Sequence, residues 1–428
     1  MTELVEIVDH VLDGGPLRAA AVECATPQPG YGVEISGWAV PVDGVIEKIE
    51  IYHGGVVLRT TTPNQSRTGT FGFGLPGVYP IGFRTFVSLL GLPHRSTLQV
   101  VARLGDEQVE IAALTLQREP LRVVPSPAIH PLIVTTLGRS GSVWLSRLVG
   151  QHPAIVSYRP FELEPRIGSY WMYALRDLGD PASILQGVAP LGLDDLWWLA
   201  PRDLGASTPV PVPEITEWVA RDHVQRVARF CLEGASAFYE HVAALQGKDA
   251  VVFYAEKYLP SFVPAMLREL DAGAKEVFLV RDPRDQLASV VSWTAAGRAQ
   301  FSPDAKTAEE YVDWLGPQTK SLLRHWQARR ETSLLVRYED LILAPEATLT
   351  RLFEYLGLDS SAQTVNVVVG KAGRAKRKLQ RQHRTSGSAE KSVARWRTDI
   401  DAALWPRLEE VFAPELEAWY REGVAANG

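Results

Sequence analysis

Residues 131–150 contain the pattern that most limits the fold of this chain: a short apolar run, a turn with two glycines, and a run with helical spacing. The apolar run covers residues 132–134, and the turn reads Gly-Arg-Ser-Gly-Ser over residues 138–142. Apolar residues then recur at the spacing of one helix face up to residue 149. The pattern predicts a strand, a tight turn and a helix.

The same turn has the chemistry of an anion site. Glycines let backbone N–H groups close around an anion, and the N-terminus of the next helix directs free N–H groups at the same point. Arg139 adds a fixed positive charge, and Ser140 and Ser142 add hydroxyl donors. No Lys-Ser or Lys-Thr pair follows the second glycine, so the turn is not a Walker A loop. We predict a phosphate-type site here; the alternative is an ordinary strand-to-helix turn.

Short apolar runs alternate with helical patterns in the C-terminal part of the chain. The runs cover residues 132–136, 154–158, 251–255, 277–280 and 334–338. Such runs suit strands buried on both faces of a parallel sheet, with helices between them. The predicted fold class is therefore α/β, with a P-loop-type parallel sheet flanked by helices in residues 131–428. Residues 167–247 read as an inserted helical cap, and caps over α/β sites commonly shape substrate pockets.

The first 120 residues follow an all-β pattern. Strand-like runs cover residues 33–40, 45–62, 85–90, 98–104 and 109–117, with Gly, Pro and Asn between them. Gly54 and Gly55 predict a hairpin turn, whereas residues 4–13 form an amphipathic segment without a clear assignment. Short strands separated by turn signals indicate a β-sandwich-like accessory domain. Residues 121–130, within a proline-rich stretch, are the predicted linker.

Composition excludes several classes of function. The chain of 428 residues is long enough for two or three domains, and its net charge of −6 provides no basic field for nucleic acid. Its two cysteines are far apart, so neither a disulfide framework nor a metal site is predicted. No apolar run reaches the length of a membrane span, and the N-terminus lacks the basic region of a secretory signal. We therefore expect a cytoplasmic protein.

A second candidate anion site lies in residues 277–293. The predicted strand at residues 277–280 ends at Arg281, Asp282 can cap a helix, and Pro283 suits its first turn. Ser289 follows about two turns into that helix. Arg281 and Ser289 could grip one anion together. The alternative is an arginine salt bridge and a solvated serine.

A third candidate region is residues 380–397, which continue from a basic run that starts at Lys371 and ends at Arg384. Gly387 between two serines indicates a flexible loop, and residues 392–397 read as the start of a helix. A basic run of this kind is usually a solvated surface. The functional interpretation is a lid that closes on a polyanion.

Together these motifs resemble the sulfotransferase family that uses 3′-phosphoadenosine 5′-phosphosulfate (PAPS), with a tail similar to that of bacterial members. The resemblance covers roughly residues 131–400, in the family's order. The family's 5′-phosphosulfate loop resembles residues 138–145, and its 3′-phosphate motif resembles Arg281 with Ser289 eight positions later. The remaining similar stretches are the Tyr-Glu-Asp-Leu signature, the segment after it and the adenosine-covering tail, at residues 337–345, 352–358 and 383–397.

The resemblance implies a PAPS-dependent sulfotransferase that needs no metal, and it assigns roles by position. The 5′-phosphosulfate would be held by Arg139, Ser140, Gly141, Ser142 and Val143. The 3′-phosphate would be held by Arg281 and Ser289, with Ser386 and Arg395 of the tail as weaker candidates for the same nucleotide.

The sequence departs from the cytosolic small-molecule members of this family in two places. Those members have Lys where Arg139 stands, whereas glycan, protein-tyrosine and several bacterial members have Arg. They also carry a catalytic His in a Lys-Thr-His-Leu-Pro stretch, and the matching position here is Tyr258. The general base must therefore be another residue, and we expect a carboxylate.

Three glutamates are candidates for that base. Glu162 lies in residues 161–166, just after the second predicted strand, where protein-tyrosine and several bacterial members carry their base. Glu256 stands at the end of the third predicted strand, where parallel-sheet sites assemble, and Glu164 is a close neighbour of Glu162. We rank Glu162 first, then Glu256, then Glu164. The alternative for either Glu162 or Glu164 is a structural salt bridge.

The predicted reaction is sulfuryl transfer from PAPS to an acceptor hydroxyl of a glycan, lipid or secondary metabolite. Sulfuryl transfer resembles phosphoryl transfer, with in-line attack and charge that builds on the leaving bridge oxygen. Arg139 and Lys257 are the cations available to neutralise that oxygen. The alternatives are a P-loop nucleotide-dependent kinase, which would need a lysine in the turn, and a non-catalytic binding protein on a sulfotransferase scaffold.

Overall fold

A computed structural model describes most of the chain, and the chain divides into two compact units. One unit comprises Met1–Pro125 and Tyr170–Leu232, and the other comprises Ser126–Ser169 and Glu233–Gly428. The described residues are 2–9, 15–28, 31–63, 65–68, 78–121, 123, 127–158, 166–179, 222–297, 305–374 and 389–421.

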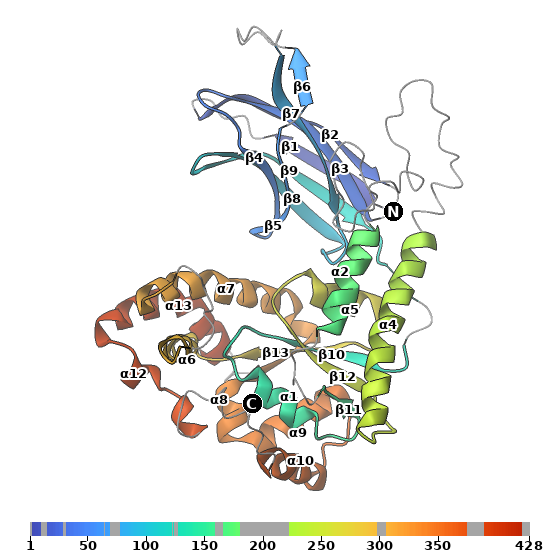
Figure 1. Cartoon of the computed structure of the whole chain (residues 1–428), viewed down its shortest axis with the longest axis vertical. Helices are drawn as coiled ribbons and strands as arrows, with labels where there is room; N and C mark the ends of the chain where they lie inside the picture. The colour runs from blue at the N-terminus through green and yellow to red at the C-terminus, as the bar shows by residue number, and fades with distance from the viewer. Residues whose placement is uncertain are drawn as a thin grey trace. The chain divides into compact units, whose positions relative to one another are not determined.

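The N-terminal part of the first unit is all-β, as the sequence predicts (Figure 1). A five-stranded antiparallel sheet has the order β1-β9-β8-β4-β5, and a four-stranded antiparallel sheet has the order β2-β3-β7-β6. The strands are β1 (Thr2–Asp9), β2 (Leu17–Gln28), β3 (Gly32–Pro41), β4 (Lys48–His53), β5 (Val56–Thr61), β6 (Gln65–Thr68), β7 (Val78–Ser88), β8 (Arg95–Leu104) and β9 (Glu107–Arg118).

The two sheets share one apolar core, which makes this region a β-sandwich. Val33 and Phe83 of the four-stranded sheet pack into the same buried cluster as Ile49 and Leu98 of the five-stranded sheet. In β3 and β9 buried residues alternate with more exposed ones, as expected for strands that turn one face to a core.

The hairpin predicted at Gly54 and Gly55 is present between β4 and β5. His53 pairs with Val56 across a two-residue turn, and both glycines have positive φ, 55° and 78°. Two successive positive φ values define the turn that matches strand twist, and glycine adopts them without steric cost.

The second unit holds a five-stranded parallel sheet, which confirms the predicted α/β class. Its strands are β10 (His130–Thr135), β11 (Ile155–Val156), β12 (Phe253–Tyr258), β13 (Lys275–Val280) and β14 (Leu334–Arg337). The order is β11-β12-β10-β13-β14, with every neighbouring pair parallel. The first strand, β10, is central, and the chain turns to one side of it for β11 and to the other for β13. Ligands of such sheets bind beyond the carboxyl ends of the strands at this switch point.

Helices cover both faces of this sheet (Figure 1). On one face, α1, α9 and α10 bury apolar side chains against β10, β12 and β13; on the other, α6, α7 and α13 pack against β13, and α4 packs against β11 and β12. The α-helices of the described residues are α1 (Ser142–Val149), α2 (Ile167–Gly179), α4 (Val224–Leu245), α5 (Phe262–Leu270), α6 (Pro283–Ala295), α7 (Ala308–Arg329), α8 (Tyr338–Leu343), α9 (Pro345–Leu356), α10 (Ala362–Arg374), α12 (Trp396–Asp399) and α13 (Trp405–Leu416). Short 3₁₀ or π turns occupy Arg330–Thr332, Glu390–Ser392, Ala402–Leu404 and Glu417–Arg421.

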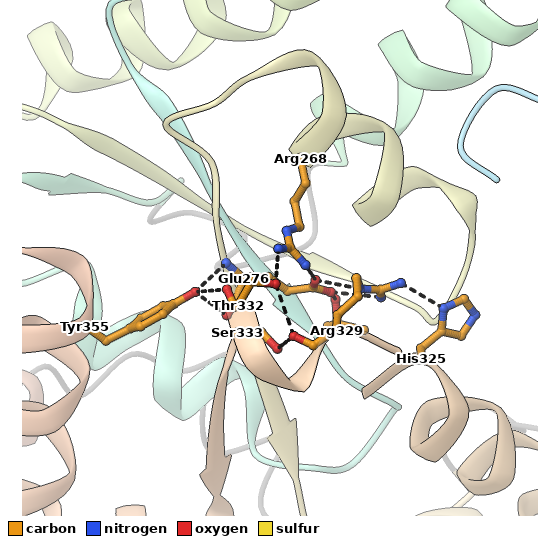
Figure 2. A network of polar contacts seen from close by, with 8 residues as sticks. Arg268, Glu276, His325, Arg329, Thr332, Ser333 and Tyr355 are labelled. Carbon is orange, nitrogen blue, oxygen red and sulfur yellow. Dashed lines mark hydrogen bonds and ion pairs between the residues drawn. The ribbon is translucent and has the colours of Figure 1, made fainter. Parts of the chain in front are cut away.

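A buried ion-pair network joins several of these elements (Figure 2). Glu276 of β13 has no exposed surface and accepts from Arg329 of α7, at 2.8 Å from Nε and 3.0 Å from Nη2. Arg268 of α5 donates to the same carboxylate at 3.2 Å, and the Thr135 hydroxyl of β10 donates at 2.6 Å. The carboxylate therefore links two strands and two helices.

The structure corrects one part of the sequence prediction, and it describes only part of another. The amphipathic segment at residues 4–13 overlaps strand β1, which pairs antiparallel with β9, and its residues 10–13 are not among the described ones. The predicted cap at residues 167–247 contains α2 and α4, while its residues 180–221 lie outside the described part of the chain.

Candidate nucleotide-binding site

The turn between β10 and α1 has the geometry that its glycine requires. Gly141 has φ 84°, and a Cβ atom at this position would lie 2.2 Å from the Tyr338 ring. Arg139 also has a positive φ, 63°, which is uncommon for a residue with a side chain. Within the described residues no side chain caps α1 at Gly141, so its first N–H groups remain available to an anion.

Three hydrogen bonds hold this turn in place. The Ser140 hydroxyl donates to the Leu137 carbonyl at 3.1 Å, and the Thr136 hydroxyl donates to the Leu279 carbonyl at 2.6 Å. The Gln286 amide of α6 donates to the Gly138 carbonyl. The turn is thus fixed by neighbouring parts of the fold before any ligand binds.

Arg139 and Ser289, predicted from separate motifs, lie in contact. The Arg139 Nε donates to the Ser289 hydroxyl at 3.1 Å, and its guanidinium lies over the Trp293 ring, 4.3 Å from the ring centre. Ser289 is buried on α6, whose N-terminus is capped by Asp282 as the sequence predicts. The two candidate anion motifs therefore form one site.

Arg281 is a buried cation between this turn and the tail of the chain. It is 5% exposed; Nη1 donates to the Arg139 carbonyl at 3.0 Å, and Nη2 donates to the Ser392 carbonyl at 2.7 Å. Its guanidinium lies over the Tyr338 ring, 4.6 Å from the ring centre. Among the described residues, its Nε has no hydrogen-bond partner and no carboxylate forms an ion pair with it. The carboxylates of Asp285 and Glu339 act on this guanidinium electrostatically, but neither is bonded to it directly. A buried charge whose direct partners are carbonyls and whose Nε is an unpaired donor favours an anion.

The tail contributes a second buried arginine with a different environment. Arg395 donates to Asp399 at 2.7 Å through Nε and to the Ser292 hydroxyl at 2.9 Å through Nη2. Its charge is therefore compensated by a carboxylate four residues later. Ser386, the other tail candidate, lies outside the described residues.

Strand β12 separates two candidate catalytic residues. The strand continues to Tyr258, three residues beyond the predicted run, so Glu256 and Lys257 lie within it. Successive side chains of a strand point to opposite faces. Lys257 shares the face of Phe253 and Ala255, which pack in one cluster with residues of α1, whereas Glu256 shares the face of Tyr254, which packs in one cluster with residues of α4. Lys257 is therefore on the sheet face that carries α1 and the turn at residues 138–142, the anion turn.

Glu256 is fully buried, and its carboxylate accepts four hydrogen bonds. The N–H groups of Ile167 and Gly168 at the start of α2 donate at 2.7 and 3.0 Å. The Tyr258 hydroxyl donates at 2.5 Å, and the Tyr239 hydroxyl of α4 donates to the other oxygen. Burial raises the pKa of the Glu256 carboxyl above its usual value, and these hydrogen bonds oppose that effect. Burial also raises the pKa of the Tyr258 phenol, so it remains a donor.

The other two candidate bases, Glu162 and Glu164, lie outside the described residues. Val143 occupies the first turn of α1, next to Ser142. No group of three or more His, Cys, Asp and Glu side chains suited to a metal ion occurs among the described residues. No helix in the same part of the chain has the length and hydropathy to cross a membrane.

Sequence reasoning missed several residues that build this site. Trp293 and Tyr338 stack on its two arginines, and Asp285 binds the backbone of the tail. Gln286 binds the turn through the Gly138 carbonyl, and Ser392 accepts a hydrogen bond from Arg281. The Asp-Pro-Arg-Asp sequence at residues 282–285 signals a helix start, but nothing local shows that Asp285 binds residues more than 100 positions away.

The model of the sulfotransferase family matches residues 131–362, more than half of the chain. A comparison of the sequence with curated proteins gives no match.

Three similar solved structures are all sulfotransferases. A domain from the curacin biosynthetic pathway is 12% identical, with a TM-score of 0.40 over 68% of this chain and 98% of that one. A sulfotransferase of Mycobacterium avium is 14% identical, with a TM-score of 0.34 over 69% and 78%. A mouse sulfotransferase complexed with 3′-phosphoadenosine 5′-phosphate (PAP) is 11% identical, with a TM-score of 0.38 over 67% of this chain and 85% of that one. The match of the family model over residues 131–362 shows that the chain belongs to the sulfotransferase family.

Proposed function

We propose that this protein transfers a sulfuryl group from PAPS to an acceptor hydroxyl of a glycan, lipid or secondary metabolite. The observation that supports PAPS as the donor is the environment of Arg281. This buried guanidinium contacts the anion turn and the tail, lacks an ion pair among the described residues, and has an unpaired Nε there. A 3′-phosphate would supply a directly bonded, charge-assisted acceptor, which the more distant carboxylates of Asp285 and Glu339 do not provide.

The remaining donor contacts would come from the anion turn. The N-terminus of α1, the backbone of Ser140 and Gly141, and the Ser142 hydroxyl would hold the 5′-phosphosulfate, because a helix N-terminus favours negative charge. Arg139 would hold the same group from its place over Trp293. The donor supplies the sulfuryl group and leaves as 3′-phosphoadenosine 5′-phosphate (PAP).

Positioning and charge neutralisation would account for most of the catalysis. Lys257, on the sheet face that carries α1, would neutralise charge on the leaving bridge oxygen. A carboxylate would take the proton of the acceptor hydroxyl, and Glu162 is our first candidate for this role. We also propose that residues 1–120 form an accessory domain and that residues 121–130 link it to the transferase domain.

Replacing Arg281 by alanine should weaken PAP binding by about 2 kcal/mol, or about 30-fold, the value of a hydrogen bond to a charged group. The loss should be much smaller for adenosine 5′-phosphate, which lacks the 3′-phosphate. Isothermal calorimetry with both nucleotides measures the difference. Before that test, a thermal shift of the wild type by PAP, and not by ADP or ATP, separates a sulfotransferase from a nucleotide kinase.

Arg351→Ala is a matched control for this variant. Arg351 also donates to a backbone carbonyl, at 3.1 Å to Leu335, and its Nε is also unpaired in the described part of the chain. It lies on α9, whereas Arg281 contacts the anion turn. Its removal should leave the affinity for PAP unchanged. Equal losses for PAP and adenosine 5′-phosphate in Arg281→Ala would remove the assignment of Arg281 to the 3′-phosphate.

A further inference from the structure

The segment at residues 392–396 is fixed onto the helix that carries Ser289. Ser392 is buried, its carbonyl accepts from Arg281, and its hydroxyl lies 2.7 Å from the Tyr338 hydroxyl. Trp396, four residues later, packs in the apolar core with residues of α6 and α7. Within this short segment the chain therefore reaches both the buried cation and the core.

Asp285 is the residue that ties this segment to α6. It lies in the first turn of the helix and is 1% exposed. One carboxylate oxygen accepts from the Ala394 N–H at 2.7 Å, and the other accepts from the Trp396 N–H at 2.9 Å. A carboxylate that accepts two backbone N–H groups fixes both the position and the orientation of the peptide between them.

The backbone between these two contacts has a conformation that needs such support. Ala394 has φ 56°, in the left-handed region that residues with a Cβ rarely adopt. This conformation costs about 1 kcal/mol or more relative to ordinary helical or extended backbone. The segment therefore keeps its shape because its surroundings hold it, and Asp285 binds on both sides of the strained residue.

The orientation of Arg281 depends on this segment. Its two Nη groups are held by two carbonyls from distant parts of the chain, Arg139 on the anion turn and Ser392 on the tail. If residues 392–396 shift, one of the two contacts is lost and the guanidinium can rotate about its side chain. Ser392 lies two residues before the Ala394 N–H that Asp285 binds, so the Asp285 contacts set the position of the Ser392 carbonyl.

We propose that Asp285 is a positioning residue for the nucleotide site: through the backbone of residues 392–396, it holds the tail that orients Arg281 toward the 3′-phosphate. This inference rests on the proposed function, since it concerns the same nucleotide. Asp285 does not touch the nucleotide itself. It acts through the backbone that places the Ser392 carbonyl, and its charge also acts on the Arg281 guanidinium. Ala394→Pro keeps that charge, so it isolates the backbone route.

Asp285→Asn tests this role with little change in volume. The variant replaces one accepting oxygen by an amide group that faces a backbone N–H. We expect the affinity for PAP to fall about tenfold, the equivalent of one hydrogen bond to a charged group. The affinity for adenosine 5′-phosphate should change less than about twofold. A general loss of stability would lower both affinities alike, so the ratio of the two is the measure of positioning. Hydrogen exchange of the amides at residues 392–396 should accelerate.

Asp401→Asn is the matched control. Asp401 also accepts from a backbone N–H, that of Ala403 at 3.0 Å, but it does so in an exposed turn. The same chemical change there should leave the affinity for PAP unchanged.

A second pair of variants tests the same contact from the side of the tail. Ala394→Pro removes the N–H that Asp285 accepts and excludes a positive φ, while α6 keeps its sequence. It should lower the affinity for PAP as Asp285→Asn does. Ala394→Gly keeps the N–H and adopts a positive φ without strain, so it should retain wild-type affinity. Ala394 is exposed, so neither change removes core packing.

The outcomes separate the two proposals. A wild type that does not bind PAP overturns the proposed function, and the nucleotide role of Asp285 with it. A wild type that binds PAP, together with Asp285→Asn and Ala394→Pro variants that keep its affinity and its preference for the 3′-phosphate, overturns only the positioning role. Selective loss of PAP binding in both variants, with Ala394→Gly unaffected, supports it.

Discussion

Glu276→Gln should lower the free energy of unfolding by about 3–5 kcal/mol, the cost of removing one member of a buried ion pair. The carboxylate has no exposed surface, while the Arg268 and Arg329 side chains are only 20% and 14% exposed. Loss of the negative charge would leave two arginines inside the fold without their carboxylate. The urea midpoint of the unfolding transition measures the loss, provided that its slope is unchanged.

Glu331→Gln is the control for this prediction. Glu331 pairs with Arg330 at 3.2 Å, but its side chain is 85% exposed. Exposed ion pairs contribute little, so the same substitution there should change the free energy of unfolding by less than about 1 kcal/mol. If Glu276→Gln is no more destabilising than Glu331→Gln, the network in Figure 2 does not stabilise the fold.

The network also explains why β13 keeps a glutamate among apolar residues. Strands buried on both faces normally read as continuous apolar runs, and residues 277–280 do so. Glu276 is the second residue of the strand, and its partners come from α5, α7 and β10. None of these partners is local to residue 276, so the sequence around it predicts only a strand boundary.

The parts of the fold that the sequence predicts correctly are those with local causes. The turn at residues 138–141 and the hairpin at Gly54 and Gly55 each require a positive φ, and the glycines that adopt it are visible in the sequence. The Asp282 cap and the following proline fix the start of α6 in the same way. Strand β1 was not predicted because acidic residues interrupt its apolar pattern, and its partner β9 lies more than 100 residues away.

The candidate site shows the same division. Arg139, Arg281 and Ser289 stand in recognisable motifs, and the structure brings them together. The tail contacts could not be predicted, because Arg281 and Ser392 are 111 positions apart and no local pattern pairs them. Proximity of this kind comes from the parallel sheet and its helices, which bring distant segments to one edge.

Glu256 illustrates a different limit. A glutamate at the end of an apolar run is normally exposed, and its position favours a catalytic role. The structure instead buries it completely, because Tyr239 of α4 and the start of α2 supply donors from separate segments. The sequence identifies the residue but not the environment that decides what it does.

Glu162→Gln should lower kcat by about 10²–10⁴-fold, the usual contribution of a general base. The amide cannot accept the proton of the acceptor hydroxyl, yet it keeps the size of the side chain. Donor contacts are assigned to other residues, so the affinity for PAP should be nearly unchanged. Initial rates with an acceptor that the wild type sulfates, together with calorimetry of PAP binding, measure both quantities.

Glu164→Gln and Glu256→Gln are the comparison variants. Glu164→Gln should keep a kcat close to that of the wild type, because our proposal gives the base to its neighbour. Near wild-type turnover in Glu162→Gln, with either comparison variant inactive while folded and able to bind PAP, would transfer the role to that residue.

The geometry of Glu256 gives a further reason to rank it below Glu162. A carboxylate has about four lone-pair sites, and four donors already occupy those of Glu256. A general base needs a free lone pair directed at the acceptor hydroxyl. Glu256→Gln would instead place an amide group against the N–H of Gly168 or Ile167, neither of which can rotate away. We therefore expect this variant to lose about 1–3 kcal/mol of stability, the cost of an unsatisfied buried donor, and to keep its catalytic rate.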